Sequence, residues 1–237
     1  MKIDRAPFRF KQFSIHQANS PLKLGTDGVM LGVWAHHPNP KRILDIGTGT
    51  GIIALMQAQK YPEAEVLAID INPNSLMDAR LNFKLSPWKH RLKAEEARAQ
   101  EFTTDQAFDL IITNPPYFTE ETKSESLEKD MARHQDSLSL GDIFAVSSRI
   151  MHENSLLQLI IPSSQKRDAI WEASLKEFYP TECTYLVTAL GKPAERVMLS
   201  FRKAYQSAIA EDELHIHQEA KWEEILKWRR LKQCFYL

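Results

Sequence analysis

Apolar and polar positions follow two alternating periods along this chain. Short runs rich in Ile, Leu and Val, typical of buried strands, are followed by segments in which apolar residues recur at helical spacing. The predicted strands are 43–46, 65–70, 91–94, 108–113, 155–161, 182–189 and 195–203, and the predicted helices are 51–60, 74–84, 141–152 and 164–178. This order predicts an α/β fold, a doubly wound sheet with helices on both faces.

The last two predicted strands have no helical segment between them. Gly191, Lys192 and Pro193 separate them and are typical of a tight turn. We therefore predict a hairpin, which makes the last strand antiparallel within an otherwise parallel sheet.

A glycine-rich loop connects the first predicted strand to the first helix of this sheet. Such a strand–loop–helix unit is typical of a nucleotide-binding fold. A dinucleotide fingerprint would have its third glycine at position 52, where this chain has Ile52. The spacing favours a smaller anion at the helix N-terminus, such as the carboxylate of S-adenosylmethionine, although a plain tight turn is the alternative. The cofactor-binding candidates in this loop are Asp45, Gly47, Thr48, Gly49 and Gly51.

The second predicted strand ends in an acid, Asp70, about twenty residues beyond the loop, where a carboxylate can accept both ribose hydroxyls. Ile71 is expected to cover one face of the cofactor's adenine. Glu96 is the candidate acceptor for the adenine amino group. The alternatives are a helix N-cap at Asp70 and a solvated helix start at 94–97.

A buried strand at 109–113 runs into a stiff turn, Asn114-Pro115-Pro116-Tyr117. Two prolines fix φ and lack N–H groups, so the carbonyls around them stay directed at a pocket. Asn114 and a carbonyl near Pro115 can accept the two hydrogens of a planar amino group, while Tyr117 offers a stacking face. Such an amine can attack a methyl group in line without a general base. An ordinary Asn-Pro turn with Tyr117 in the core is the alternative.

Composition narrows the class of protein. With 237 residues, 43% of them hydrophobic, one α/β domain is expected. The two cysteines lack metal-ligand spacing and the N-terminus lacks a signal peptide, so we expect a reduced, cytoplasmic protein. No apolar run approaches the roughly 18 residues that span a membrane. His215 and His217 lack a third ligand, so no metal is expected. The expected state is a monomer.

The formal net charge of −1 does not indicate a polyanionic partner, but basic and aromatic residues gather near both ends of the chain. Arg9 and Lys11 alternate with phenylalanines, and Arg229 and Arg230 lie beside tryptophans. This pattern is typical of nucleic-acid binding, and an amphipathic C-terminal helix packed on the core is the alternative. The polar segment 119–137 predicts either a solvated loop or a lid over the substrate.

Together, the glycine loop, Asp70 and the Asn-Pro-Pro-Tyr turn resemble the class I methyltransferases that act on exocyclic and amide nitrogens. Further motifs are similar to the bacterial tRNA1(Val) adenine-N6-methyltransferase family. These motifs are Phe8–Phe13, Gly25–Val29, Arg133-His134, Ser137–Leu140, Gly191–Pro193, Arg196-Val197 and Phe235–Leu237.

The resemblance implies a Rossmann-like sheet, S-adenosylmethionine as cofactor and tRNA as partner. It implies that Thr26 and Asp27 cover the methionine end of the cofactor, with helix capping as their alternative role. If segment 119–137 is a lid over the substrate, Arg133 and His134 would face phosphate. The complete set of candidate RNA contacts is Arg9, Lys11, Arg133, His134, Lys192, Arg196, Arg229 and Arg230.

The expected organisation is one methyltransferase domain over 1–237. It comprises an N-terminal extension at 1–40 that covers substrate and cofactor, a cofactor-binding core at 41–203, and a C-terminal tail at 204–237. The expected reaction is methylation of N6 of an adenosine in tRNA, adenine-37 next to the anticodon of tRNA1(Val). A protein glutamine-N5 methyltransferase and a non-catalytic RNA-binding module stay open as alternatives, since a glutamine amide presents the same geometry to the turn.

Overall fold

A computed structural model describes residues 6–116, 138–189 and 191–216 of the chain. Within these residues the main sheet has the strand order β10-β8-β9-β7-β6-β3-β4-β5, and a small hairpin precedes it. The strands are β1 (Phe8–Arg9), β2 (Ser14–Ile15), β3 (Arg42–Ile46), β4 (Glu65–Asp70), β5 (Leu92–Glu96), β6 (Phe108–Thr113), β7 (Met151–Pro162), β8 (Tyr179–Val187), β9 (Arg196–Arg202) and β10 (Ala210–His215).

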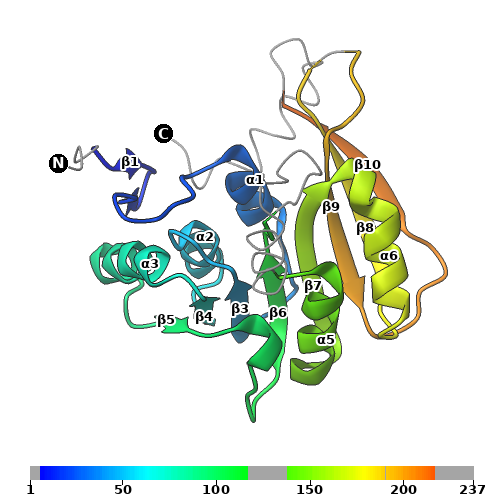
Figure 1. Ribbon diagram of the computed structural model, residues 1–237, viewed down its shortest axis with the longest axis horizontal. Coiled ribbons are helices and arrows are strands. Elements are labelled where there is room, and N and C mark those ends of the chain that lie inside the picture. Colours follow the sequence, from blue (N-terminus) through cyan, green and yellow to red (C-terminus); the bar gives the residue numbers. More distant parts are fainter. Residues whose placement is uncertain (1–5, 117–137, 190, 217–237) are drawn as a thin grey trace, which may run out of the picture.

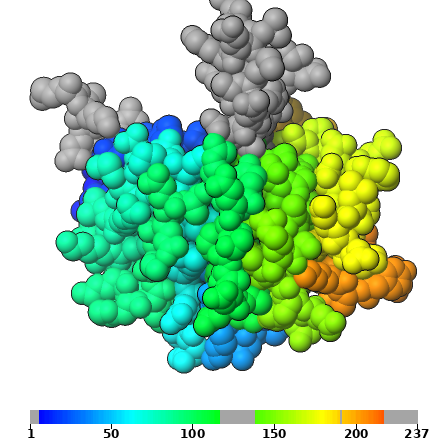
Figure 2. Space-filling view, turned by 60° about the horizontal axis from the view of Figure 1, so that its bottom comes forward, coloured from blue at the N-terminus to red at the C-terminus, as the bar shows by residue number. Residues whose placement is uncertain are grey.

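The sheet confirms the predicted topology. Strands β3 to β7 pair in parallel, whereas β9 lies antiparallel between β7 and β8 and forms a hairpin with β8. In the space-filling view the surface colours pass from teal through green to yellow across the molecule, with orange at the lower right (Figure 2).

Helices cover both faces of the sheet, as predicted (Figure 1). One core cluster joins α1, α2 and α3 to one face, and a second joins α5 and α6 to the other. The helices are α1 (Thr26–Trp34), α2 (Ile52–Lys60), α3 (Pro73–Leu85), α5 (Leu140–Ile150) and α6 (Lys166–Ser174), with short 3-10 turns η1 (Ala99–Glu101) and η3 (Ser163–Gln165). Among the described residues, no helix is both long and apolar enough to cross a membrane.

Strand β10 adds an edge that the sequence analysis had assigned to a C-terminal tail. It pairs in parallel with β8 and lies at one end of the sheet in Figure 1. Leu214 is deeply buried, while the four residues from Ala210 to Glu213 are exposed. Apolar periodicity could not identify this strand, because backbone pairing rather than side-chain burial places it in the sheet.

The boundary between α6 and β8 differs from the predicted one. The helix ends at Ser174 instead of 178, and β8 begins at Tyr179 instead of 182. Ala169, Ala173 and Phe178 are buried in one core cluster, but Phe178 follows Ala173 by five positions, which departs from helical spacing. The turn itself has Glu177 at φ 58, a conformation that apolar periodicity does not reveal.

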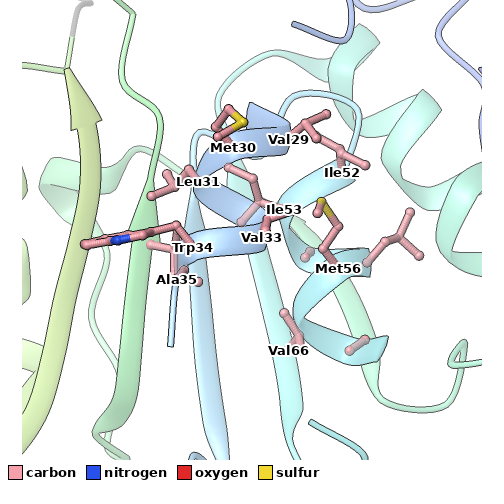
Figure 3. Packing of buried hydrophobic residues seen from close by; sticks show 14 of the residues in the cluster. Val29, Met30, Leu31, Val33, Trp34, Ala35, Ile52, Ile53, Met56 and Val66 are labelled. Carbon is pink, nitrogen blue, oxygen red and sulfur yellow. The ribbon is translucent and has the colours of Figure 1, made fainter. Parts of the chain in front are cut away.

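Helix α1 packs between α2 and the sheet. Figure 3 shows Val29 and Val33 facing Ile52, Ile53 and Met56 across the interface between the two helices. The helices approach closely, since a Cβ atom on Gly32 would lie 2.5 Å from the Met56 sulfur. On its other side Trp34 donates a hydrogen bond of 3.0 Å to the Thr184 hydroxyl of β8. Segment 25–35 is therefore an integral part of the core.

Replacing Gly51 by alanine should destabilise the fold strongly. Gly51 has φ +82, and an added Cβ atom would lie 2.5 Å from a ring carbon of Phe83 on α3. The left-handed conformation costs about 1–2 kcal/mol for a non-glycine residue, and overpacking adds about 1–3 kcal/mol. Urea unfolding measures the loss of unfolding free energy.

Gly47→Ala is the matched control, since Gly47 has φ +71 but no atom within 4 Å of the added Cβ. This variant should show the conformational cost alone. Equal losses in the two variants would mean that contact with Phe83 does not require glycine at position 51.

Candidate active site

The chemically distinctive residues meet at one edge of the sheet. Strands β4 and β6 flank β3 and run parallel to it, so their carboxyl ends lie side by side. The glycine loop follows β3, Asp70 ends β4, and Asn114 follows β6. Open α/β sheets bind ligands at this edge.

Among the described residues, two of the cavities at this edge are lined by both the glycine loop and the Asn-Pro turn. The first has a volume of about 230 Å³, and its walls include Gly47, Gly49, Asp70 and Ile71. The second has a volume of about 550 Å³ and is lined by segment 22–28, much of the glycine loop, and Asn114 to Pro116. Thr26, Asp27 and Thr48 therefore lie at the second cavity.

The cavities meet at the Asn-Pro turn. Within the described chain, the residues that line both are Leu22, Gly47, Gly49, Asn114 and Pro116. The structure thus brings the turn and the glycine loop together, although 64 positions lie between Gly49 and Asn114 in the sequence, counted from their residue numbers. A group in either cavity would therefore lie beside these shared residues.

Backbone hydrogen bonds hold the glycine loop against β4. The amides of Gly47 and Thr48 donate to the carbonyl oxygen of Ile69, at 2.9 and 3.0 Å. Gly47, Gly49 and Gly51 have φ values of 71, 57 and 82°, a region that residues with a Cβ rarely adopt. These glycines are required by the shape of the turn.

Asp45 lies beneath this loop. Its side chain is buried, and one carboxylate oxygen accepts hydrogen bonds from the Thr48 hydroxyl at 2.6 Å and from the Ala54 amide at 3.2 Å. Burial raises the pKa of the Asp45 carboxyl to about 7. Asp45 lines neither cavity of the described chain and supports the loop from within. Its contact with the cofactor stays a prediction.

Asp70 holds the other side of the loop and also faces the first cavity. Its oxygens accept from the Gly49 amide and from the Asn72 amide, each at 2.8 Å. The N-cap of α3 is Asn72, whose side chain accepts from Asn74 and Ser75, so the capping alternative for Asp70 is wrong. A carboxylate has about four lone-pair positions, which leaves Asp70 with acceptors for a ligand.

Of the two residues expected beside the cofactor's adenine, Ile71 and Glu96, only Ile71 lines the first cavity in the described residues. Ile71 lines it and is 47% exposed, whereas Glu96 is exposed at the end of β5 and does not line either cavity in the described residues. Residues 97–100, which follow β5 directly, line the first cavity, as do Pro21 and Leu22. These residues could have been predicted from their position in the sequence, because they follow the carboxyl end of β5, a parallel strand next to β4.

Asp27 and Arg196 were assigned to different partners, the cofactor and RNA. In the structure they form an ion pair, with 2.8 Å between Arg196 Nε and an Asp27 oxygen. Both side chains are partly buried, which connects the start of β9 to the start of α1. Arg196 is thus held at the second cavity's wall through Asp27.

The other RNA candidates within the described residues line neither cavity. Arg9 and Lys11 are exposed near the β1–β2 hairpin, and Lys192 is exposed in the β8–β9 turn. Of the aromatic residues between the basic ones, Phe10 and Phe13 are buried in the core, so only Phe8 of the three is open to solvent. Outside the described residues lie Tyr117, Arg133, His134, Arg229, Arg230, the candidate lid at 119–137 and the candidate C-terminal helix.

This arrangement defines a Rossmann-like methyltransferase. An antiparallel β9 completes the sheet, and the glycine loop and a strand-end carboxylate flank a cavity that joins the Asn-Pro turn. Residues 25–167 match the family model of the methyltransferase small domain.

Curated relatives narrow the assignment. The chain is 36% identical over 205 residues to the tRNA1(Val) (adenine(37)-N6)-methyltransferase of Phocaeicola vulgatus, which covers 86% of this chain and 87% of the relative. It is 38% identical over 241 residues to the protein of that name from Christiangramia forsetii, with 99% of each chain covered. The chain belongs to the tRNA1(Val) (adenine(37)-N6)-methyltransferase family.

Solved structures share the fold at low sequence identity. A predicted O-methyltransferase from Agrobacterium tumefaciens has a TM-score of 0.63 and 19% identity, covering 82% of this chain and 90% of its own. A ribosomal protein L11 methylase from Lactobacillus delbrueckii subsp. bulgaricus has a TM-score of 0.53 and 20% identity, covering 75% and 77%. These likenesses concern the sheet and its helices alone.

Asp45→Asn should alter how stability depends on pH. A carboxyl whose pKa rises from 3.8 to about 7 on folding binds its proton more tightly in the folded state. The contribution of Asp45 to wild-type stability therefore falls as pH rises from about 4 to 7, by at most about 1.4 kcal/mol per pH unit. The variant lacks this titration. Its unfolding free energy, measured with urea across that pH range, should therefore rise relative to that of the wild type. Parallel stability curves would contradict the raised pKa.

Proposed function

We propose that this protein transfers the methyl group of S-adenosylmethionine to the exocyclic N6 of adenine-37 in tRNA1(Val). The observation that carries the proposal is the position of Asn114 and Pro116, which line both cavities. A donor in one cavity and an amino group in the other would meet at this turn. The relatives named for this reaction match nearly the whole chain, which supports the same chemistry here.

The residues of the first cavity fit the adenosine part of the cofactor. Asp70 offers acceptors for the ribose hydroxyls, and Ile71, Ala97 and Ala99 offer apolar surface for the adenine ring. When bound, the cofactor would supply an electrophilic methyl group on a sulfonium. The Asp70 carboxylate also holds the loop amide of Gly49, so the ribose site and the loop shape depend on one side chain.

The methionine end fits the boundary with the second cavity. Gly51 is the N-cap of α2, and the positive end of that helix favours a carboxylate. Thr26 and Asp27 line the same cavity from the start of α1, and Asp27 is held there by Arg196. An acid in this position favours an ammonium group.

The acceptor adenine would enter the second cavity, beside the turn. Asn114 then accepts one hydrogen of the N6 amino group, and the carbonyl near Pro115 accepts the other, which directs the nitrogen lone pair along the line of attack. As the new nitrogen–carbon bond formed, the carbon–sulfur bond of the sulfonium would break and leave a neutral thioether. The nitrogen would become cationic and release its proton to water. Positioning by the turn therefore supplies most of the rate enhancement.

Asn114→Ala should reduce methyl transfer at least about 100-fold, because the acceptor nitrogen loses its orientation. Cofactor affinity, measured by calorimetry in the absence of tRNA, should change little. Asn154→Ala is the control, an exposed asparagine near the amino end of β7. If Asn114→Ala lost affinity and transfer by the same factor, Asn114 would act in cofactor binding alone.

Asp70→Ala should weaken cofactor binding about 100-fold, since it removes acceptors for two hydroxyl hydrogen bonds and the hold on Gly49. Calorimetric titration with S-adenosylmethionine measures this. Asp105→Ala, which removes an exposed acid elsewhere, should bind normally. Unchanged affinity in Asp70→Ala would move the ribose to another site.

The acceptor itself is tested with labelled cofactor and total tRNA from cells that lack this protein. We expect label in one tRNA, tRNA1(Val), and mapping of the nucleoside should give N6-methyladenosine at position 37. Label that appears only in a protein glutamine would replace the proposed substrate while leaving the Asn-Pro turn as the site of transfer.

A further inference from the structure

Helix α3 carries a polar stripe on a buried face. Ser75, Asp78 and Asn82 are 3%, 1% and 1% exposed, and their spacing of three and four positions puts them in one row. Buried positions of a surface helix are ordinarily apolar. These side chains face the N-terminal segment, which lies beside α3 in Figure 1.

Asp78 binds this segment with both carboxylate oxygens. One oxygen accepts from the backbone amides of Asn19 and Ser20, at 2.9 and 2.6 Å. The other accepts from the Asn19 side-chain amide at 2.8 Å. A buried carboxylate is costly unless it is hydrogen-bonded, so Asp78 strongly favours the docked position of residues 19 and 20.

Asn82 makes a second attachment one turn further along α3. Its side chain accepts from the His16 amide and donates to the His16 carbonyl, both at 2.8 Å. It also donates to the Thr50 carbonyl at 2.9 Å. Asn82 thus ties the N-terminal segment to the glycine loop.

Residues 17–24, here called the N-terminal loop, are also closed by internal hydrogen bonds. The Leu24 amide donates to the Gln17 side chain at 2.7 Å, and the Lys23 ammonium donates to the Ser20 carbonyl at 2.8 Å. The Ser20 hydroxyl donates to the Leu22 carbonyl at 2.8 Å. The position of the loop's tip therefore follows from the position of residues 19 and 20.

The tip of the N-terminal loop lies at the meeting point of the two cavities. Pro21 lines the first cavity and Leu22 lines both. The other residues that line both belong to the glycine loop or to the Asn-Pro turn. Leu22 is nevertheless 71% exposed, so its side chain offers an apolar surface at the junction.

We propose that Leu22 is the apolar cover of the methyl-transfer junction and that Asp78 is a positioning residue that holds this cover in place. The inference rests on the proposed function, because it takes the junction as the path of the methyl group. Leu22 contacts the cofactor on one side and the flat acceptor base on the other, and it excludes water between them. Asp78 touches neither and acts through the N-terminal loop.

The Asn19–Asp78 pair allows a test by exchange. Asn19→Asp sets two carboxylates against each other, and Asp78→Asn offers the loop amides one acceptor fewer. In the double variant the exchanged amide can again donate to a carboxylate, while its oxygen accepts from the two backbone amides. Both single variants should weaken cofactor binding about tenfold or more in calorimetry without tRNA, and the double variant should recover most of that loss.

A purely structural role for Asp78 predicts a different pattern. Each single variant would then lower the melting temperature yet bind the cofactor, when folded, with wild-type affinity. That result, or a double variant that recovers stability without affinity, would overturn the inference.

Leu22→Ala keeps the test decisive if the Asp78 variants fail to fold, because an exposed side chain contributes little to stability. We expect an unchanged melting temperature, an increase of about threefold or more in the cofactor Kd, and a fall of about tenfold in kcat on tRNA. Leu175→Ala on the C-cap of α6, where Leu175 is 56% exposed, is the control and should change neither value. Wild-type binding and turnover in Leu22→Ala would overturn the inference.

Failure of the proposed function gives a separate result. A wild-type protein that binds no S-adenosylmethionine would contradict the proposed function itself. Normal wild-type binding with unaffected Leu22 and Asp78 variants would contradict only the inference about the N-terminal loop.

Discussion

The active-site architecture depends on how two carboxylates hold the glycine loop. Asp45 supports it from below through Thr48 and Ala54, and Asp70 holds it from the side through the Gly49 amide. The three left-handed glycines could adopt many conformations in an isolated chain, so these contacts select one of them. The burial of Asp45 raises its pKa to about 7, which is the electrostatic cost of that support.

Once the loop is held, the parallel sheet determines what it meets. Asn114 follows β6 and Asp70 ends β4, so strand pairing brings both to the edge where the loop lies. The N-terminal loop, which precedes the sheet in the sequence, lies at the same edge of the sheet. Asp78 on α3 holds it there by hydrogen bonds. Three segments that are distant in sequence thus surround one junction, and hydrogen bonds hold the glycine loop and the N-terminal loop in place.

Much of the fold could be predicted from apolar periodicity. The strand at 65–70, the strand at 108–113 and the antiparallel β9 are present as expected, because burial on both faces gives such strands continuous apolar runs. β10 was missed because its residues are mainly exposed. The end of α6 differs from the prediction because the turn before β8 depends on Glu177 at φ 58, which apolar periodicity does not reveal.

The sequence by itself determined the glycine loop, Asp70 and the Asn-Pro-Pro turn, because local backbone rules and strand order are written in neighbouring residues. Only the tertiary structure decided that Asp45 lies under the loop, that Asp27 pairs with Arg196, and that Leu22 stands where the cavities meet. Hydrogen bonds and ion pairs between distant segments leave no periodic signal in the chain. Their partners are chosen by packing in three dimensions.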